Sequence, residues 1–402
     1  MTSRERVQCV LAGKIPDRIP NGLGACETAG LHILAYEKMK VLAGLHSSPA
    51  KLDTFMLNAV FEQDLIHAID GDMILLASPK MCNSRFRGKD YEKEWKEQIL
   101  WGKNFQVSVK EEFTTHADGT IIWDSAGGLR CPPGGIYFDA ANPRSFSLNY
   151  DIPSPDKYNP PHSLSDTLLR DMEEAAKALY EETQLSICCG ETIEDLQKYP
   201  AGYVGTMMLM REEPDIMHEF LQKAVDASIS QLQQLNQAIG KYVDILCIAH
   251  DFGDNRNVTI GAQLWREIYK PHYMRLFREW KKTTGMKINF HSCGAIASIL
   301  PDLIECGVDI YNPVQTSATG MSAQLLKEQF GDKIILYGGA YDAQLISGDA
   351  DYETVYNCTR ESCWILKESG RYIFAGVHNL PGDLPKHHLA AMLNAWKDTR
   401  DY

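Results

Sequence analysis

Residues Ile245-Leu246-Cys247-Ile248-Ala249 are apolar at every position and lead directly into His250-Asp251-Phe252-Gly253-Asp254. A strand that is buried on both faces has this pattern, and such strands are typical of parallel sheets that are covered by helices on both sides. The polar and glycine residues that follow mark the end of the strand. The stretch therefore predicts a buried parallel strand in an α/β protein.

Seven more short apolar runs have the same form, and most are followed by a segment with helical spacing. In chain order the eight runs are 18–24, 72–77, 185–189, 242–249, 286–291, 308–313, 333–338 and 372–377. Eight strands that alternate with helices favour a closed (β/α)8 TIM barrel. A doubly wound open sheet is the alternative, but no Gly-rich dinucleotide fingerprint follows the first run.

Amphipathic segments lie between the runs and are expected to cover the barrel. Between Leu264 and Trp280, apolar residues recur at helical spacing, and Pro271 predicts a kink. Segments 297–306, 323–330 and 352–369 have similar spacing. We expect helices in all four segments.

The connection between the second and third runs is too long for a single helix. It contains Ile121-Ile122-Trp123-Asp124, the turn-prone Pro132-Pro133-Gly134-Gly135 and Ile136-Tyr137-Phe138-Asp139. These features predict a small β-rich insertion over residues 92–150 that covers one end of the barrel. The expected organisation is a single barrel over residues 1–402 that contains this insertion.

Composition narrows the classes of partner. The 402 residues include 40 Lys+Arg and 53 Asp+Glu, a formal net charge of −13, which argues against a nucleic-acid partner because phosphate binding needs a basic excess. No apolar run approaches the length of a membrane span and the N-terminus is charged, so we expect no membrane association. Eleven scattered cysteines fit reduced thiols in a cytoplasmic protein better than a disulfide framework.

The residues that end the runs are the candidates for chemistry, because a TIM barrel carries its active site at the carboxyl ends of its strands. His291 and Cys293 are spaced i, i+2, which places both side chains on one face of a strand. Zn²⁺ prefers such nitrogen and sulfur ligands. A third ligand must come from another strand end, and His378 and His250 are the candidates.

Several of these residues also have plainer interpretations. Asp251 and Asp342 could cap the helices that follow them. Buried Cys188, Cys189 and Cys247 could serve packing alone. His387 and His388 fit a solvated helix face.

The strand-end motifs resemble those of the uroporphyrinogen decarboxylase superfamily, and within it the branch of corrinoid-dependent methyltransferases and O-demethylases. The segments that carry the resemblance are His250-Asp251-Phe252-Gly253, His291-Ser292-Cys293-Gly294, Gly338-Gly339 with Asp342 and Gln344, and Val377-His378-Asn379. The resemblance implies a TIM barrel. In the thiol methyltransferases of this branch, a His-x-Cys pair and a later Cys bind zinc. Here His378 stands at the later position, which implies a site more suited to oxygen than to thiolate activation.

The same resemblance leads to an expected function. The decarboxylases hold a carboxylated substrate through N-terminal arginines, and residues 19–27 supply none, so decarboxylation is disfavoured. We expect a zinc-dependent enzyme that takes a methyl group from a methyl ether, such as a methoxylated aromatic, and passes it to Co(I) of cobalamin on a separate corrinoid protein. Asp251, Asp342 or Glu27 could donate a proton or orient a ligand.

Two other functions stay open at this point. The enzyme could instead move a methyl group from the corrinoid to a thiol or another acceptor. The chain could also be a non-catalytic barrel that binds a corrinoid or a small aromatic. Whether several copies assemble into a homo-oligomer is likewise open.

Overall fold

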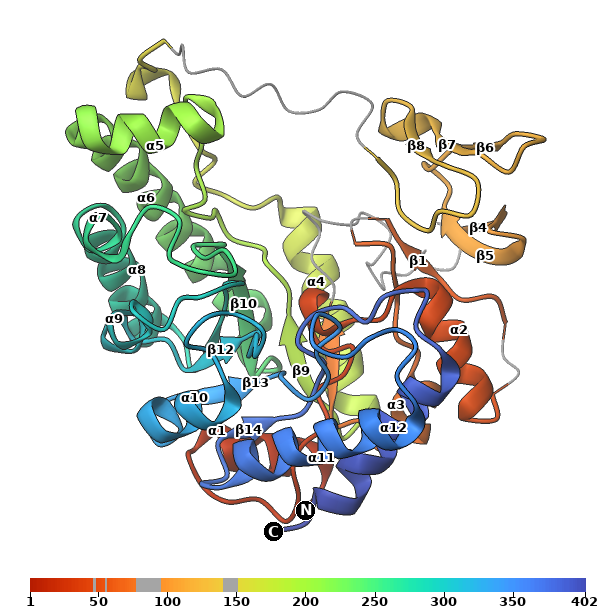
Figure 1. The fold of residues 1–402 in the computed structure, drawn as a ribbon. Helices are drawn as coiled ribbons and strands as arrows, with labels where there is room; N and C mark the ends of the chain where they lie inside the picture. Colours follow the sequence, from red (N-terminus) through yellow and green to blue (C-terminus); the bar gives the residue numbers. More distant parts are fainter. Residues whose placement is uncertain (46–47, 55, 77–94, 140–150) are drawn as a thin grey trace.

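Seven parallel strands form the centre of the molecule, in the order β14-β13-β12-β11-β10-β9-β3 (Figure 1). The computed structural model describes residues 1–45, 48–54, 56–76, 95–139 and 151–402. The strands are β3 (Met73–Leu76), β9 (Ser186–Cys189), β10 (Ile245–Ala249), β11 (Lys287–His291), β12 (Ile310–Asn312), β13 (Ile335–Tyr337) and β14 (Tyr372–Ile373). Seven of the eight predicted runs are therefore strands, although Ala77 of the second run lies outside the described residues.

The first run is not a regular strand, which corrects one expectation, but it occupies the eighth position and closes the ring. On one side Phe374 donates to the Pro20 carbonyl and Gly22 donates to the Phe374 carbonyl. On the other side Asp72 donates to the Asn21 carbonyl. The ladder stays short because Pro20 has no N–H and because the Asn21 N–H binds the Asp72 carboxylate. The fold is a TIM-barrel-like ring of parallel strands.

The two faces of the strands pack in different cores. Alternate residues such as Ile245, Cys247 and Tyr337 point into the barrel, where they meet Val7 and Val10 of α1 (Ser3–Leu11). The intervening residues pack against the surrounding helices. The side chains of the odd-numbered residues of β10 therefore face the barrel interior. The same alternation along each strand determines which candidate site residues point inward.

Helices surround the sheet and alternate with its strands (Figure 1). Besides α1 they are α2 (Ile33–Leu42), α3 (Gln63–Ala68), α4 (Asp166–Glu182), α5 (Gly202–Glu212), α6 (Pro214–Ile239), α7 (Ala262–Ile268), α8 (Lys270–Thr283), α9 (Leu300–Cys306), α10 (Ala323–Phe330), α11 (Tyr352–Lys367) and α12 (Lys386–Thr399). The single helix predicted around Pro271 is two helices, because a proline near the start of α8 cannot donate to the preceding turn.

The insertion after β3 is β-rich, as predicted. It contains a hairpin of β4 (Trp95–Leu100) and β5 (Lys103–Ser108) and a three-stranded sheet of β6 (Phe113–Thr115), β7 (Ile121–Trp123) and β8 (Leu129–Cys131). Residues 92–94 and 140–150 of the predicted range lie outside the described residues. A short hairpin of β1 (Leu52–Asp53) and β2 (Asn58–Ala59) adjoins it and was not predicted.

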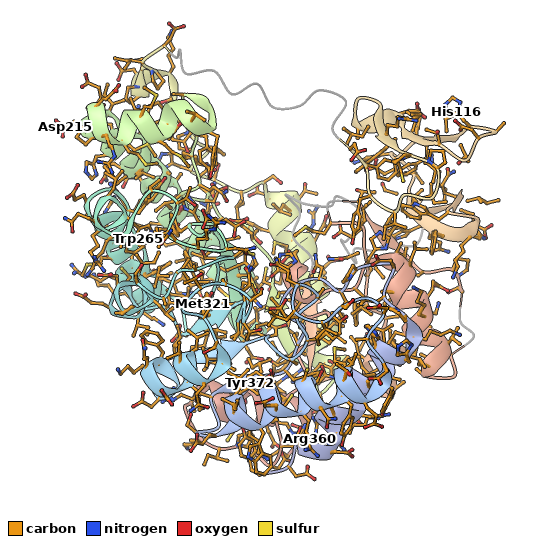
Figure 2. The ribbon with its side chains drawn as sticks, viewed as in Figure 1. His116, Asp215, Trp265, Met321, Arg360 and Tyr372 are labelled. Atoms are coloured by element: carbon orange, nitrogen blue, oxygen red, sulfur yellow. The ribbon has the colours of Figure 1, made fainter. Side chains whose placement is uncertain are left out.

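The insertion and α5 stand on opposite sides of one end of the barrel (Figure 1). Figure 2 shows His116 of the insertion far from Asp215, which lies at the start of α6. His32 fastens the insertion to the barrel: its Nε2 lies 3.0 Å from the Ile136 carbonyl, and its ring contacts those of Trp101 and Tyr137. Within the parts of the chain that the structure describes, none of the helices is long and apolar enough to cross a bilayer.

Candidate metal centre

Three of the predicted metal ligands meet at the carboxyl ends of β11 and β14. One nitrogen each of His291 and His378 and the Cys293 sulfur lie within 4.8 Å of one another. His291 Nε2 is 3.4 Å from Cys293 Sγ. The rings of His291 and His378 stand edge to face, with their centroids 5.5 Å apart. This group is the candidate metal centre.

Strand parity brings His291 and Cys293 together. His291 is the last residue of β11, and Asn289 two residues before it already faces the barrel interior, where it donates to Cys247 Sγ. Gly294 then turns the chain, with a φ of 88° that favours glycine. The Gly294 N–H donates to Gln315 at 2.7 Å, which fixes the loop that carries Cys293.

His378 comes from the loop after β14. Its neighbour Asn379 accepts a hydrogen bond from the Gly30 N–H at 2.9 Å. This bond joins the loop to the segment that follows the closing run. The loop that carries His378, the third candidate ligand, is thus held by a residue that is distant in the sequence.

Among the residues that the structure describes, Asp251 places a carboxylate beside the group. Its Oδ1 lies 3.6 Å from His291 Nε2 and accepts the Cys293 N–H at 2.9 Å. The side chain is 55% exposed, so the carboxylate also faces the open end of the barrel. It caps no helix, because α7 begins only at Ala262.

Burial disfavours the charged forms of Cys293 and His378 in the absence of a cation. Burial, together with the charge of Asp251, raises the pKa of the Cys293 thiol well above its usual range. Burial and the adjacent His291 lower the pKa of His378 to about 4. A divalent cation would reverse the first effect, because a coordinating thiol is deprotonated. Two imidazoles and a thiolate around one point are a donor set that fits Zn²⁺, with a fourth position left for another ligand.

His250 does not join this group. It follows the inward-facing Ala249, so its ring points to the helix side of the sheet. There Nδ1 lies 2.9 Å from the Tyr273 hydroxyl, and the ring stacks near Phe252. Burial lowers the pKa of His250 to about 3. It is a neutral core histidine that supports the strand end.

The other two predicted catalytic carboxylates lie away from the metal ligands. Asp342 accepts hydrogen bonds from the Ser317 N–H, the Gln344 N–H and the Thr316 hydroxyl, so it holds two strand-end loops rather than a helix. Glu27 is buried in the short helix Glu27–Ala29, on the segment that follows the closing run. Neither residue reaches the group described above.

Sequence reasoning missed Asn312 and Thr28. Asn312 Oδ1 lies 2.8 Å from His291 Nδ1, and the Thr28 hydroxyl donates to the same oxygen at 2.7 Å. Asn312 ends the sixth predicted run, so its position was the available signal. His388, predicted on a solvated face, is buried and bonded to Tyr341, because α12 packs that side inward.

The fold and this group define a (β/α)8-type barrel with a candidate metal centre at the carboxyl ends of its strands. Residues 169–399, more than half of the chain, match the family model described as uroporphyrinogen decarboxylase (URO-D). The chain belongs to the uroporphyrinogen decarboxylase family. No curated protein sequence matches it.

One solved structure agrees with this fold. A methyltransferase from Methanosarcina mazei is similar over 99% of both chains, with a TM-score of 0.57 and 14% sequence identity. A B12-independent methionine synthase from Shewanella sp. W3-18-1 covers 94% of this chain and 93% of its own, with 10% identity and a TM-score of 0.36. The first likeness supports the barrel architecture, and the second is too weak to bear on the fold or the function.

Proposed function

We propose that this protein is a zinc-dependent methyltransferase that demethylates a methyl ether, such as a methoxylated aromatic. The methyl group passes to Co(I) of cobalamin on a separate corrinoid protein. The observation that carries the proposal is the meeting of His291, Cys293 and His378 within 4.8 Å at the strand ends. Membership of the uroporphyrinogen decarboxylase family and the resemblance of the motifs to its corrinoid-dependent branch support the same class.

The reaction sets a clear chemical demand. The bond between the methyl carbon and the ether oxygen breaks, a bond between that carbon and cobalt forms, and the oxygen keeps the electron pair. An aryl leaving group is a phenolate whose conjugate acid has a pKa of about 10, so the oxygen needs stabilisation or a proton. A bound Zn²⁺ would supply Lewis-acid stabilisation at that oxygen.

The residues of the chain divide this work. His291, Cys293 and His378 would hold the metal ion. Asp251 is half exposed beside them and touches the backbone of Cys293, so it is placed to orient a ligand. Asp342 would act by positioning, because three hydrogen bonds already occupy its carboxylate.

Metal content is the first test. Purified protein is expected to bind about one Zn²⁺ per chain, and His291→Ala and His378→Ala are expected to lose it. His250→Asn is the matched control, because His250 ends a neighbouring strand but faces the helices. If the wild-type protein binds no zinc, or if methyl transfer continues unchanged after chelation, the metal mechanism is wrong.

A methyl-transfer assay with a corrinoid protein tests the direction. Methoxylated phenols are expected to act as donors, with formation of the methylated corrinoid followed by its absorbance. Transfer from the methylated corrinoid to a thiol, with no ether demethylation, would favour the thiol methyltransferase instead. Zinc binding with neither reaction would favour a non-catalytic barrel.

A further inference from the structure

Asn312 lies directly behind one of the metal ligands. It is the last residue of β12, it is completely buried, and its Oδ1 is 2.8 Å from His291 Nδ1. The same oxygen accepts the Thr28 hydroxyl at 2.7 Å, while Asn312 Nδ2 donates to the Tyr337 carbonyl at 3.3 Å. All three polar contacts of this amide therefore have defined partners.

The contacts fix which way round the amide lies. A carbonyl oxygen only accepts, so the Tyr337 carbonyl requires the NH2 group of Asn312 on its side. Oδ1 then faces His291 and Thr28. An acceptor at this position requires His291 to carry its proton on Nδ1, which leaves the lone pair on Nε2, the atom 3.4 Å from Cys293 Sγ.

We propose that Asn312, held by Thr28, is a positioning residue that fixes His291 as an Nε2 ligand of the metal ion. This inference rests on the zinc site of the proposed function and adds to it the residues that prepare the site. Hydrogen-bond partners of this kind orient a ligating histidine, and their loss commonly costs 10–100-fold in metal affinity.

The choice of an amide rather than a carboxylate also has a consequence. Asp251 already places one negative charge beside His291, and a thiolate at Cys293 would add another. A neutral amide orients the imidazole without a third negative charge. The metal ion thereby keeps more of its positive charge for a developing oxyanion.

Asn289, on the strand of His291, provides a matched control. It is buried one layer below His291 and donates to Cys247 Sγ at 3.2 Å, so it resembles Asn312 in type and burial but does not contact the metal ligands. Replacing it disturbs the barrel interior to a similar degree. Any general effect of losing a buried amide should therefore appear in Asn289→Ala.

The test is a Zn²⁺ competition titration against a chromogenic chelator, with unfolding curves to confirm that each variant folds. Asn312→Leu is expected to bind Zn²⁺ about 10–100-fold more weakly, and Thr28→Val about 3–10-fold. Asn312→Asp keeps the acceptor toward His291 but loses the donor to the Tyr337 carbonyl, and is expected to bind Zn²⁺ more tightly than Asn312→Leu. Asn289→Ala is expected to bind as the wild type does.

Cobalt substitution gives a second readout. The visible bands of bound Co²⁺ are expected to shift in Asn312→Leu and to stay unchanged in Asn289→Ala. Wild-type affinity in both Asn312→Leu and Thr28→Val, or equal weakening in Asn289→Ala, would overturn the inference. Absence of zinc from the wild-type protein would instead refute the proposed function, so the two failures are distinguishable.

Discussion

Gly294 decides where the Cys293 sulfur can lie. Its φ of 88° belongs to the region that side chains rarely adopt, and an added Cβ would come within 2.5 Å of the Gly253 carbonyl carbon. The backbone at Gly294 and the backbone at Gly253 therefore lie too close together for a side chain at position 294. The sulfur position depends on this contact, because Cys293 is the preceding residue.

We predict that Gly294→Ala lowers the free energy of unfolding by about 2–4 kcal/mol, since it adds a backbone clash to an unfavourable φ. Urea unfolding measures this loss. Gly261→Ala is the control, because Gly261 has a φ of 81° but open space around its Cβ position. If both variants lose the same amount, the close approach to Gly253 contributes nothing.

Cys293→Ser tests the sulfur itself. A hydroxyl is a harder and less acidic ligand than a thiol, so we predict at least about a tenfold loss of Zn²⁺ affinity with little change in fold. Equilibrium dialysis with metal analysis measures the affinity. Cys358→Ser, at an exposed thiol on α11, is expected to leave zinc binding unchanged. Retention of zinc by Cys293→Ser would remove the thiol from the ligand set.

Single residues also show where sequence reasoning reached its limit. His291, His378 and His250 all follow apolar runs, and spacing alone did not separate them. The separation depends on strand parity, since Ala249 pairs with His291 in the sheet and both face inward, while His250 comes one residue later. Parity needs the register of neighbouring strands, which the sequence does not state. Asn312 was visible as a strand end, but its link to His291 depends on the same register.

At the level of elements, a buried ion cluster supports the closing segment 20–22. Asp72 is fully buried and accepts hydrogen bonds from Arg6 of α1 at 2.6 Å and from Arg18 at 2.8 Å. Its second oxygen also accepts the Asn21 N–H at 2.8 Å. One carboxylate thus joins the helix at the barrel base, the closing segment and the start of β3.

We predict that Asp72→Asn destabilises the protein by about 3–5 kcal/mol, because it leaves the largely buried guanidinium of Arg18 without its counter-charge and leaves Arg6 with Asp17 alone. Thermal and urea unfolding give the value. Glu181→Gln is the control, since its ion pair with Lys177 is well exposed on both sides and should matter by less than about 0.5 kcal/mol. A loss below 1 kcal/mol in Asp72→Asn would mean that closure does not depend on this cluster.

The elements followed the sequence where hydrophobic pattern alone determines them. Buried runs gave seven strands, and the segment from Ala323 to Phe330 is α10 to the residue. The first run differed because Pro20 has no N–H and because the Asn21 N–H binds the Asp72 side chain, and pattern analysis weighs neither effect. The small hairpin of β1 and β2 was missed because strands of two residues carry no periodicity.

On the scale of the whole molecule, His32 links the barrel to the insertion. Its Nδ1 accepts the Leu34 N–H at 3.2 Å, and its Nε2 donates to the Ile136 carbonyl, so both nitrogens are satisfied only in the neutral ring. Burial lowers the pKa of His32 to about 4. On acidification, His32 of the unfolded chain takes up a proton near pH 6.5, a higher pH than in the folded protein.

Stability should therefore fall with acidification. The contribution of neutral His32 is complete above about pH 6.5 and is lost as the pH falls toward 4, by about 3 kcal/mol. His32→Gln, which retains a donor for Ile136, is predicted to show a shallower fall in urea unfolding between pH 7 and pH 4.5. Equal slopes of unfolding free energy against pH for the wild type and His32→Gln would show that His32 does not cause the fall. Hydrogen exchange at Ile136 would show whether the insertion opens before the barrel.

The ring of strands is closed by the pairing of Asn21 with Phe374, residues that lie far apart in the sequence. During synthesis, Asn21 leaves the ribosome long before its partner exists. Until Phe374 is available, the incomplete ring has an unpaired edge beside β3. Contacts between residues so far apart in the sequence form slowly. A nascent chain in which Phe374 has not yet left the exit tunnel should therefore remain protease-sensitive and a substrate for chaperones, however stable the finished protein is.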